Sequence, residues 1–298
     1  MLLSAIKEND NNETRVSISP ESVKLFSRLG FEVIIENGAG ETSGYQNSNY
    51  EEAGAKIVTR SECLKADVCL CVRMPSTDDI NNLKSNSLLI GILNPYENKS
   101  EFSNLNKNKI SSCCMELIPR ISRAQSMDVL SSQANLAGYR SVIDAAEQFG
   151  KAFPMMMTAA GRVNPAKVMI LGVGVAGLQA IATAKRLGAV VSATDVRAAT
   201  KEQVESLGGK FIMVEDDEAE NAETAGGYAK EMSEDYKKKQ AQLIADTVSK
   251  QDIVICTALI PGKKAPVLIT EEMVSSMIPG SVVIDLAVEA GGNCPLSK

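Results

Sequence analysis

The chain of 298 residues contains no histidine and no tryptophan, and aromatic residues make up only 4% of it. Without histidine, the chain cannot use a histidine general acid or base, a histidine-activated nucleophile or a histidine metal ligand. So few aromatic side chains disfavour a surface that stacks on nucleic-acid bases. The net charge of −6 also disfavours nucleic acid and anionic membranes as partners. We therefore expect no metal site and no nucleic-acid partner.

Long apolar runs and paired cysteine motifs are also missing. No stretch of 18 apolar residues occurs, so we expect no membrane span in this chain. The first eight residues lack the charged and apolar regions of a signal peptide. None of the seven cysteines forms a C-x-x-C pair, and most lie in apolar runs. This pattern indicates buried reduced thiols rather than a disulfide framework or a zinc site.

The length favours two domains, and the content of 44% hydrophobic and 23% charged residues is that of a globular protein. Short apolar runs alternate with helical patterns. The expected strands are 2–6, 31–35, 55–58, 67–72, 88–93 and 109–115, then 167–171, 190–194, 211–214, 252–257 and 281–286. This order predicts an α/β fold of two Rossmann-like domains with parallel sheets. We place the domains at 1–131 and 132–298, joined by a long helix over about 132–153, with a ligand site in the cleft.

One helix start can be predicted residue by residue. Ser19 is a suitable N-cap and Pro20 a suitable first helical residue, so a helix should begin there and end near Gly30.

The strongest local signal is a glycine loop between an apolar run and a helical run, with the sequence Gly172-Val173-Gly174-Val175-Ala176-Gly177. In such a loop Gly172 permits the tight turn, Gly174 lets the backbone approach a pyrophosphate, and Gly177 lets the helix pack closely on the strand. The next expected strand ends in Asp195, 18 residues after Gly177, close to the usual spacing of about 20. The pattern predicts a dinucleotide site; the alternative is a glycine turn in an unrelated α/β domain.

Asp195 points to the kind of dinucleotide. Its carboxylate would accept hydrogen bonds from the adenosine ribose and would repel a 2′-phosphate, which favours NAD over NADP. Arg197 complicates this interpretation, because an arginine there could pair with that phosphate.

A polar segment lies between the last expected strand of the first domain and the long helix. It contains Arg120, Gln125, Asp128 and Ser131, which combine charge with hydrogen-bonding capacity. Its position predicts that it faces the interdomain cleft, where dinucleotides bind. From the residues alone, helix capping by Asp128 and Ser131 and a surface ion pair of Arg120 are the favoured explanation of the pattern.

Several longer segments carry a more specific pattern, namely residues 120–133, 153–157, 172–197, 225–232 and 258–262. With them the chain resembles the NAD(H)-binding domain, or domain I, of the alpha subunit of proton-translocating NAD(P) transhydrogenase, whose fold the alanine dehydrogenases share. The resemblance extends over essentially all of the chain.

The resemblance implies a role for each matching residue. Arg120, Gln125, Asp128 and Ser131 would form the catalytic loop around the nicotinamide, with Ser126 and Met127 beside them, and Gln125 would also face NADP(H). The remaining cofactor-binding residues would be Gly172, Gly174, Val175, Ala176, Gly177, Asp195, Val196, Arg197, Gly227, Tyr228, Ala258 and Leu259.

The segment 215–223 is rich in acidic residues and precedes Gly226 and Gly227. By itself it is typical of a solvated connection between a strand and a helix. The resemblance instead implies a mobile loop, containing Gly227 and Tyr228, that folds over the bound nucleotide.

The lack of histidine agrees with hydride transfer between two nicotinamides, which needs positioning and exclusion of water rather than acid–base catalysis. The alanine dehydrogenases use a lysine and a histidine, whereas this chain has Arg73 at the lysine position. The resemblance therefore implies an NAD(H)-binding component that exchanges hydride reversibly with NADP(H) on a partner domain. The alternatives are an alanine dehydrogenase-like oxidoreductase and a non-catalytic NAD(H)-sensing module.

The resemblance also implies partners, namely NADP(H)-binding and membrane domains of a transhydrogenase and a second copy in a homodimer. It implies a location peripheral to the membrane, on the cytoplasmic or matrix-like side. The family continues beyond the last residues of this sequence, so we expect a second domain that is truncated at its C-terminal end.

Overall fold

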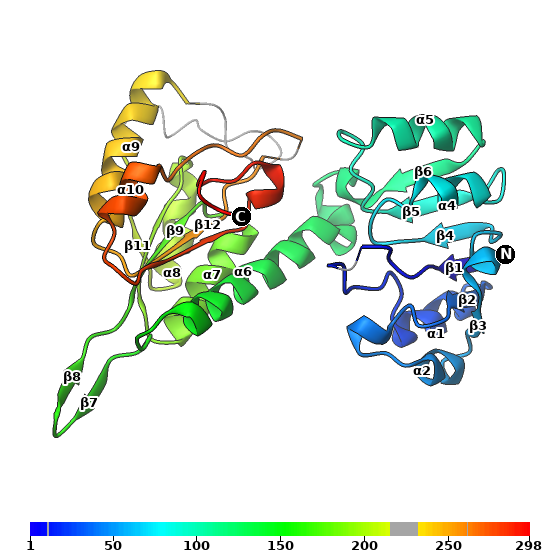
Figure 1. Ribbon diagram of the computed structural model, residues 1–298, viewed down its shortest axis with the longest axis horizontal. Coiled ribbons are helices and arrows are strands. Elements are labelled where there is room, and N and C mark those ends of the chain that lie inside the picture. Colours follow the sequence, from blue (N-terminus) through cyan, green and yellow to red (C-terminus); the bar gives the residue numbers. More distant parts are fainter. Residues whose placement is uncertain (11, 215–231, 261) are drawn as a thin grey trace. The chain divides into compact units, whose positions relative to one another are not determined.

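The computed structural model describes residues 1–10, 12–214, 232–260 and 262–298. The chain divides into two compact units, Met1–Val129 and Leu130–Lys298, and each contains its own parallel sheet (Figure 1). No helix within the described ranges has both the length and the apolar character needed to cross a membrane.

The first unit contains a six-stranded parallel sheet in the order β3-β2-β1-β4-β5-β6. Its strands are β1 (Leu2–Ala5), β2 (Glu32–Glu36), β3 (Lys56–Val58), β4 (Val68–Leu70), β5 (Leu88–Gly91) and β6 (Ser111–Cys114). The strand order reverses between β1 and β4. Ligands of such sheets bind outside the carboxyl ends of the strands at this reversal.

The helices of the first unit are α1 (Pro20–Arg28), α2 (Asn47–Glu52), α3 (Arg60–Cys63), α4 (Thr77–Asn82) and α5 (Lys99–Lys107). Helix α1 begins as predicted, with Pro20 in its first turn and the Ser19 hydroxyl accepting a hydrogen bond from the Ser22 N–H at 3.3 Å. This bond satisfies one of the amides that have no partner within the helix.

The second unit contains a five-stranded parallel sheet in the order β11-β10-β9-β12-β13. Its strands are β9 (Lys167–Leu171), β10 (Val190–Thr194), β11 (Lys210–Phe211), β12 (Ile253–Cys256) and β13 (Val282–Asp285). Strand β11 is shorter than the predicted run 211–214. Here the order reverses between β9 and β12, so the segments that follow these two strands lie at the second reversal point.

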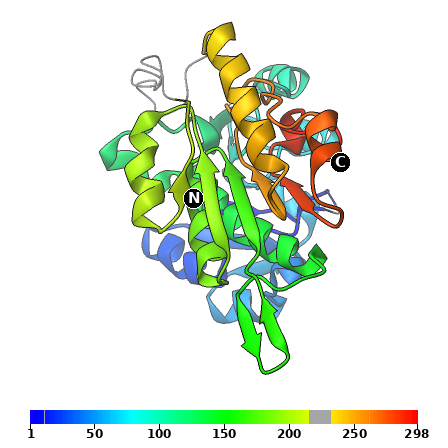
Figure 2. The same ribbon diagram turned by 90° about the vertical axis from the view of Figure 1, so that its left-hand side faces the viewer.

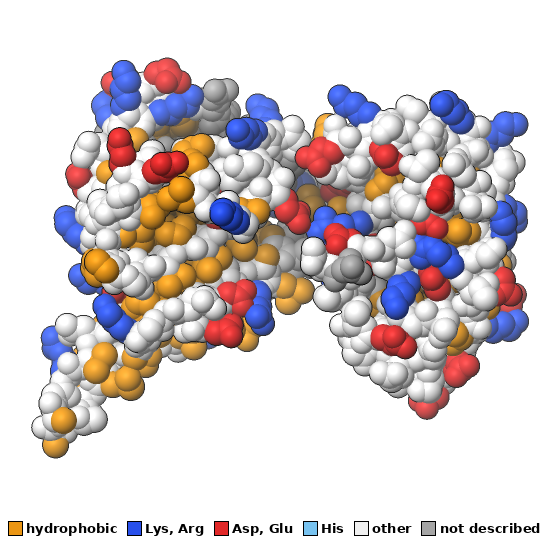
Figure 3. All heavy atoms as spheres, in the orientation of Figure 1, with side chains coloured by type: hydrophobic (Ala, Val, Ile, Leu, Met, Phe, Trp, Pro, Cys, Tyr) orange, Lys and Arg blue, Asp and Glu red, His pale blue; other side chains and the backbone are white. Residues whose placement is uncertain are grey.

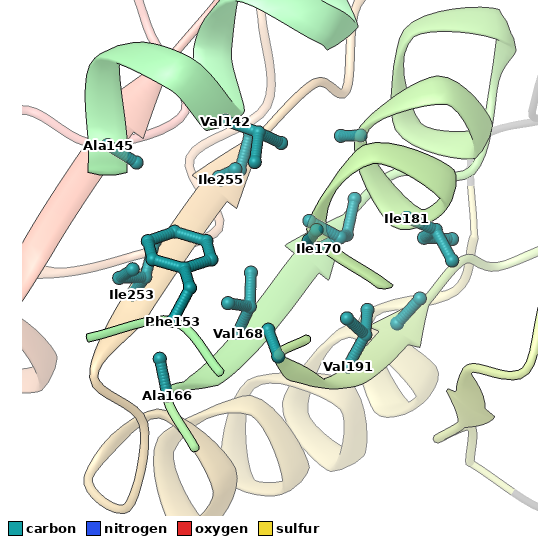
Figure 4. Packing of buried hydrophobic residues seen from close by; sticks show 14 of the residues in the cluster. Val142, Ala145, Phe153, Ala166, Val168, Ile170, Ile181, Val191, Ile253 and Ile255 are labelled. Carbon is teal, nitrogen blue, oxygen red and sulfur yellow. The ribbon is translucent and has the colours of Figure 1, made fainter. Parts of the chain in front are cut away.

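The helices of the second unit are α6 (Val129–Gln148), α7 (Val175–Arg186), α8 (Lys201–Ser206), α9 (Glu234–Val248) and α10 (Glu271–Ser276). Alternate residues of the central strand face opposite layers. Val168 and Ile170 pack with Val142 of α6 and Ile181 of α7 (Figure 4), whereas Met169 and its neighbours on that face pack with α9 and α10. Figure 2 shows helices on both faces of this sheet. The sheet is therefore buried on both sides, as parallel sheets are.

The long helix α6 differs from the predicted bounds of 132–153. It begins at Val129 and ends at Gln148. Gly150 follows closely, and Pro154 disfavours the helical conformation of the residue before it, which explains the earlier end. Phe149 and Phe153 remain in the core as an edge-to-face pair with ring centroids 6.2 Å apart.

An antiparallel hairpin that the sequence did not lead us to expect joins α6 to β9. Its strands are β7 (Met156–Thr158) and β8 (Gly161–Val163), and it extends away from the sheet of its own unit (Figure 1). Met155 and Met157 are 55% and 71% exposed, and hydrophobic side chains are visible at its tip (Figure 3). The two strands pair only with each other, and such a two-stranded ribbon has little stability by itself.

Candidate functional site

The loop between β9 and α7 has a different geometric reason for each of its three glycines. Gly172 has a φ of 95°, a conformation that favours glycine. A Cβ at Gly177 would lie 2.0 Å from the carbonyl oxygen of Gly172, so only glycine fits there. A Cβ at Gly174 would meet nothing within 4 Å. The chain thus leaves open space beside Gly174, where a pyrophosphate could approach the backbone.

The start of α7 can bind an anion through its backbone. Gly174 is the N-cap, and because it has no side chain, it leaves the first amides of the helix without a side-chain cap. These include the N–H groups of Val175 and Ala176. Twelve aligned residues add a partial positive charge at this end. Such helix starts bind phosphate groups.

Asp195 follows β10 and lies against the glycine loop. The carboxylate is nearly buried, and its Oδ2 accepts a hydrogen bond from the Val173 N–H at 2.7 Å. Arg197 folds back onto the same carboxylate, with Nη2 2.8 Å from Oδ2. Val196, between them, packs on Met232 and Tyr236. The acid and the glycine loop that the sequence separates by 18 residues are therefore in direct contact.

The segment after β12 lies on another side of the same loop. The Thr257 hydroxyl donates to the carbonyl oxygen of Gly172 at 2.9 Å, and a Cβ at Gly172 would lie 3.0 Å from the Ala258 nitrogen. Leu259, the next residue, is 47% exposed. The predicted residues Gly172, Asp195 and Ala258 thus come together at the strand-order reversal of the second sheet, and Thr257, which sequence reasoning missed, joins them.

Gly138 is a second residue that sequence reasoning missed. It lies in the middle of α6, and a Cβ there would be 2.1 Å from the carbonyl oxygen of Ala176. Glycine inside a helix is unfavourable by about 1 kcal/mol relative to alanine, so its presence was a signal of close packing.

The predicted polar segment of the first unit is ordered by its own contacts. Arg120 Nε lies 3.9 Å from the carboxylate of Asp128, and both side chains are partly exposed. Gln125, Ser126 and Met127 form the short 3-10 helix η3 (Ser122–Met127), and the Gln125 carbonyl accepts the Asp128 N–H at 3.2 Å. These five residues all belong to the first unit.

Ser131 differs from its predicted place in a loop. Because α6 begins at Val129, Ser131 lies in the first turn of that helix, and in the second unit. Asp128 is the residue immediately before the helix, where an acid interacts favourably with the helix dipole. The residues expected around the nicotinamide are thus divided between the two units. Gly227 and Tyr228 lie outside the described residues.

A separate charged network lies at the strand-order reversal of the first sheet. There a cavity of about 330 Å³ is lined by the segments that follow β1 and β4, which contain Glu8 and Arg73, and by Arg60 at the start of α3. Burial raises the pKa of Glu8, which accepts hydrogen bonds from the N–H groups of Val72 and Arg73.

Glu13 is nearly buried and binds two arginines in the same region. Arg15 Nη2 lies 2.6 Å and Arg73 Nε 2.9 Å from its Oε2. Burial alone would raise the pKa of Glu13, but the hydrogen bonds from both guanidinium groups outweigh it and bring that pKa to about 2. Glu13 is therefore ionised at neutral pH and holds Arg73 in place.

Two family models match the chain. The model of the "Alanine dehydrogenase/PNT, N-terminal domain" matches residues 4–137, and that of the "Alanine dehydrogenase/PNT, C-terminal domain" matches residues 141–298.

Similar curated proteins and solved structures include transhydrogenases and alanine dehydrogenases as well. An NAD(P) transhydrogenase alpha subunit protein from Rhodospirillum rubrum is 60% identical over 305 residues, which cover 100% of this chain and 79% of that protein. An alanine dehydrogenase from Bacillus subtilis is 30% identical, over 98% of this chain and 72% of that protein. The crystal structure of transhydrogenase from Sinorhizobium meliloti superposes with a TM-score of 0.90 at 52% identity, covering 100% of this chain and 82% of that one. The predicted fold with two Rossmann-like domains and parallel sheets is confirmed.

Proposed function

Because the chain belongs to the alanine dehydrogenase/PNT family, we propose that it is the NAD(H)-binding component of a transhydrogenase. In this proposal NADH on this chain exchanges a hydride reversibly with NADP⁺ held on a partner domain. The observation that carries it is the open space at Gly174. Gly174 directly precedes α7 and directly follows Val173, whose N–H binds Asp195. The greater identity to the transhydrogenase subunit than to the alanine dehydrogenase favours this activity within the family.

The second unit binds the adenosine and pyrophosphate parts of the nucleotide. The amides of Val175 and Ala176 hold the pyrophosphate, and the absence of a side chain at Gly174 gives it room. Asp195 and its neighbours Val196 and Arg197 surround the adenosine ribose. Ala258 and Leu259 line the site where β12 ends.

The polar segment binds the nicotinamide end. Arg120, Gln125, Asp128 and Ser131 supply charged and hydrogen-bonding groups that orient the ring and its amide, with Ser126 and Met127 beside them. Bound NADH itself supplies the hydride. The protein's task is to hold the ring at a reactive distance and exclude water, so no side chain has to act as a nucleophile or base.

The partners follow from the same proposal. The chain works with NADP(H)-binding and membrane components of a transhydrogenase, and it forms a homodimer. It is peripheral to the membrane through those components.

A hydride-transfer assay tests the proposal. The purified chain is mixed with an NADP(H)-binding transhydrogenase component, NADPH and the oxidised acetylpyridine analogue of NAD, and reduction of the analogue is followed by absorbance. We expect reduction that depends on both proteins. A folded chain that binds NADH but supports no transfer would contradict the proposal and favour a sensing module, whereas alanine-dependent formation of NADH would favour an alanine dehydrogenase.

A further inference from the structure

One buried side chain fixes both backbone polar groups of Ala258. Asn293 is fully buried. Its Oδ1 accepts the Ala258 N–H at 3.0 Å, and its Nδ2 donates to the Ala258 carbonyl oxygen at 2.9 Å. The second N–H of the amide donates to the Pro266 carbonyl oxygen at 2.7 Å. Asn293 therefore pairs with Ala258 as a neighbouring strand would, just beyond the point where β12 ends.

The backbone of Asn293 is itself held firmly. The carboxylate of Asp285, at the end of β13, accepts its N–H at 2.7 Å and that of Cys294 at 3.0 Å. The N–H groups of Leu268 and Ile269 donate to its carbonyl oxygen at 2.8 and 3.0 Å. The amide is thus a fixed point, because the groups around it leave the side chain one orientation in which every hydrogen bond is made.

Because Ala258 and Thr257 contact Gly172, the fixed position of Ala258 also constrains the glycine loop. Its nitrogen lies 3.0 Å from where a Cβ of Gly172 would be, and the preceding Thr257 donates to the Gly172 carbonyl oxygen at 2.9 Å. A shift of Ala258 would therefore move the turn that places the amides of α7. Nothing in the sequence suggested this role, because Asn293 lies 35 residues from Ala258 and outside the glycine-loop pattern.

We infer that Asn293 is a positioning residue for the nucleotide site, acting through Ala258 and Thr257 on the glycine loop. This inference rests on the proposed function, since it assigns the same loop to the pyrophosphate. Asn293 touches no nucleotide in this account. Its side chain sets the backbone geometry of residues that do, so its loss should weaken NADH binding more than it slows hydride transfer.

The substitution Asn293→Asp tests this inference with almost no change in shape. The carboxylate keeps an acceptor for the Ala258 N–H but loses both donors and faces two carbonyl oxygens. We expect the NADH Kd, measured by quenching of NADH fluorescence, to rise about tenfold. In the hydride-transfer assay KM for the NAD(H) substrate should rise similarly, while kcat at saturation should change less than about twofold.

A matched control separates positioning from general loss of stability. Val248 of α9 is fully buried in the core cluster that contains Cys294, and Val248→Ala should lower Tm without changing the NADH Kd. If Asn293→Asp does not fold, Asn293→Ser removes the amide without adding charge, and the same rise in Kd is expected.

The outcomes distinguish the inference from the proposed function. A wild-type chain that binds no NADH would contradict the proposed function. Wild-type binding together with an unchanged Kd in a folded Asn293 variant would overturn the inference alone. A rise in Kd equal to that of Val248→Ala would also overturn it, because stability alone would then explain the effect.

Discussion

The guanidinium of Arg197 donates to both oxygens of Asp195, with Nε 2.8 Å from Oδ1 and Nη2 2.8 Å from Oδ2. The backbone N–H groups of Arg197 and Val173 donate to the same oxygens at 2.9 and 2.7 Å. These four bonds fill the roughly four acceptor positions of an ionised carboxylate. A ribose hydroxyl can therefore bind Asp195 only by replacing one of these donors, and the Arg197 side chain is the donor that can rotate away.

The substitution Asp195→Asn should change the preference between the two nucleotides. It removes the charge that repels a 2′-phosphate and releases Arg197 to pair with that phosphate. We expect the NADH Kd to rise and the NADPH Kd to fall, so that their ratio shifts by about tenfold or more. Isothermal titration of both nucleotides on the folded variant measures this.

The variant Arg197→Ala is the matched control, because it keeps the acid and removes the cation. It should retain the preference for NADH over NADPH. Equal NADPH affinity in the wild type and in Asp195→Asn would show that the pair does not determine which nucleotide binds.

Close packing of α6 on the first turn of α7 gives a second prediction. A Cβ at Gly138 would lie 2.1 Å from the Ala176 carbonyl oxygen, so Gly138→Ala must move one helix or the other. Overpacking of this kind destabilises by about 1–3 kcal/mol, which exceeds the gain of about 1 kcal/mol in helix propensity. We expect a lower Tm in a thermal melt and a higher NADH Kd.

Gly150 provides the control for that substitution. A Cβ there meets nothing within 4 Å, and its φ is outside the left-handed region. Gly150→Ala should change the free energy of unfolding by less than about 0.5 kcal/mol and leave the Kd unchanged. If Gly138→Ala is as stable as Gly150→Ala and binds NADH equally well, the close packing of α6 on α7 does not determine stability or NADH affinity.

Local rules account for what could be predicted from the sequence. The cap at Ser19 and the glycine loop act over a few residues, and the order of alternating strands and helices suffices to predict a parallel sheet. Interactions between neighbouring residues are sufficient for these features.

The remaining features depend on contacts that the order of residues does not reveal. Asn293 acts on a backbone 35 residues away, and Gly138 matters only because α7 lies against it. The methionines of the β7–β8 hairpin are exposed although they are apolar, so hydrophobic periodicity could not find that ribbon. The sequence also does not reveal that the Arg197 side chain binds the Asp195 carboxylate directly.

Acid should destabilise the first unit through Asp79. Arg60 donates to both of its oxygens at 2.7 Å, and this guanidinium holds the pKa of Asp79 well below its usual range. A carboxyl group whose pKa is lowered in the folded state stabilises fully above its unfolded pKa of about 3.9 and loses this effect as the pH falls below it. We expect the free energy of unfolding, from urea titrations, to fall steadily below about pH 4.

The variant Asp79→Asn should remove part of this acid dependence. At pH 7 it should also lower the free energy of unfolding by about 1.5–3 kcal/mol, the usual effect of losing a charged hydrogen bond. Glu32→Gln is the control, because the Glu32–Lys56 pair is exposed and contributes little. An Asp79→Asn variant that keeps the full acid dependence of the wild type would assign that dependence to other carboxylates, such as Glu13.

Thiol reactivity should distinguish Cys113 from the other cysteines. All seven are free, but Cys113 is exposed because β6 is an edge strand. Burial raises the pKa of Cys63 to about 12 and that of Cys69 to about 11, so few of these thiols ionise, and the thiolate is the reactive form. Iodoacetamide at pH 8 should therefore modify the folded chain first at Cys113, as read by mass spectrometry, and the variant Cys113→Ser should remove this fast reaction. Early modification of Cys63 or Cys69 in the folded chain would mean that the first sheet opens far more readily than its packing implies.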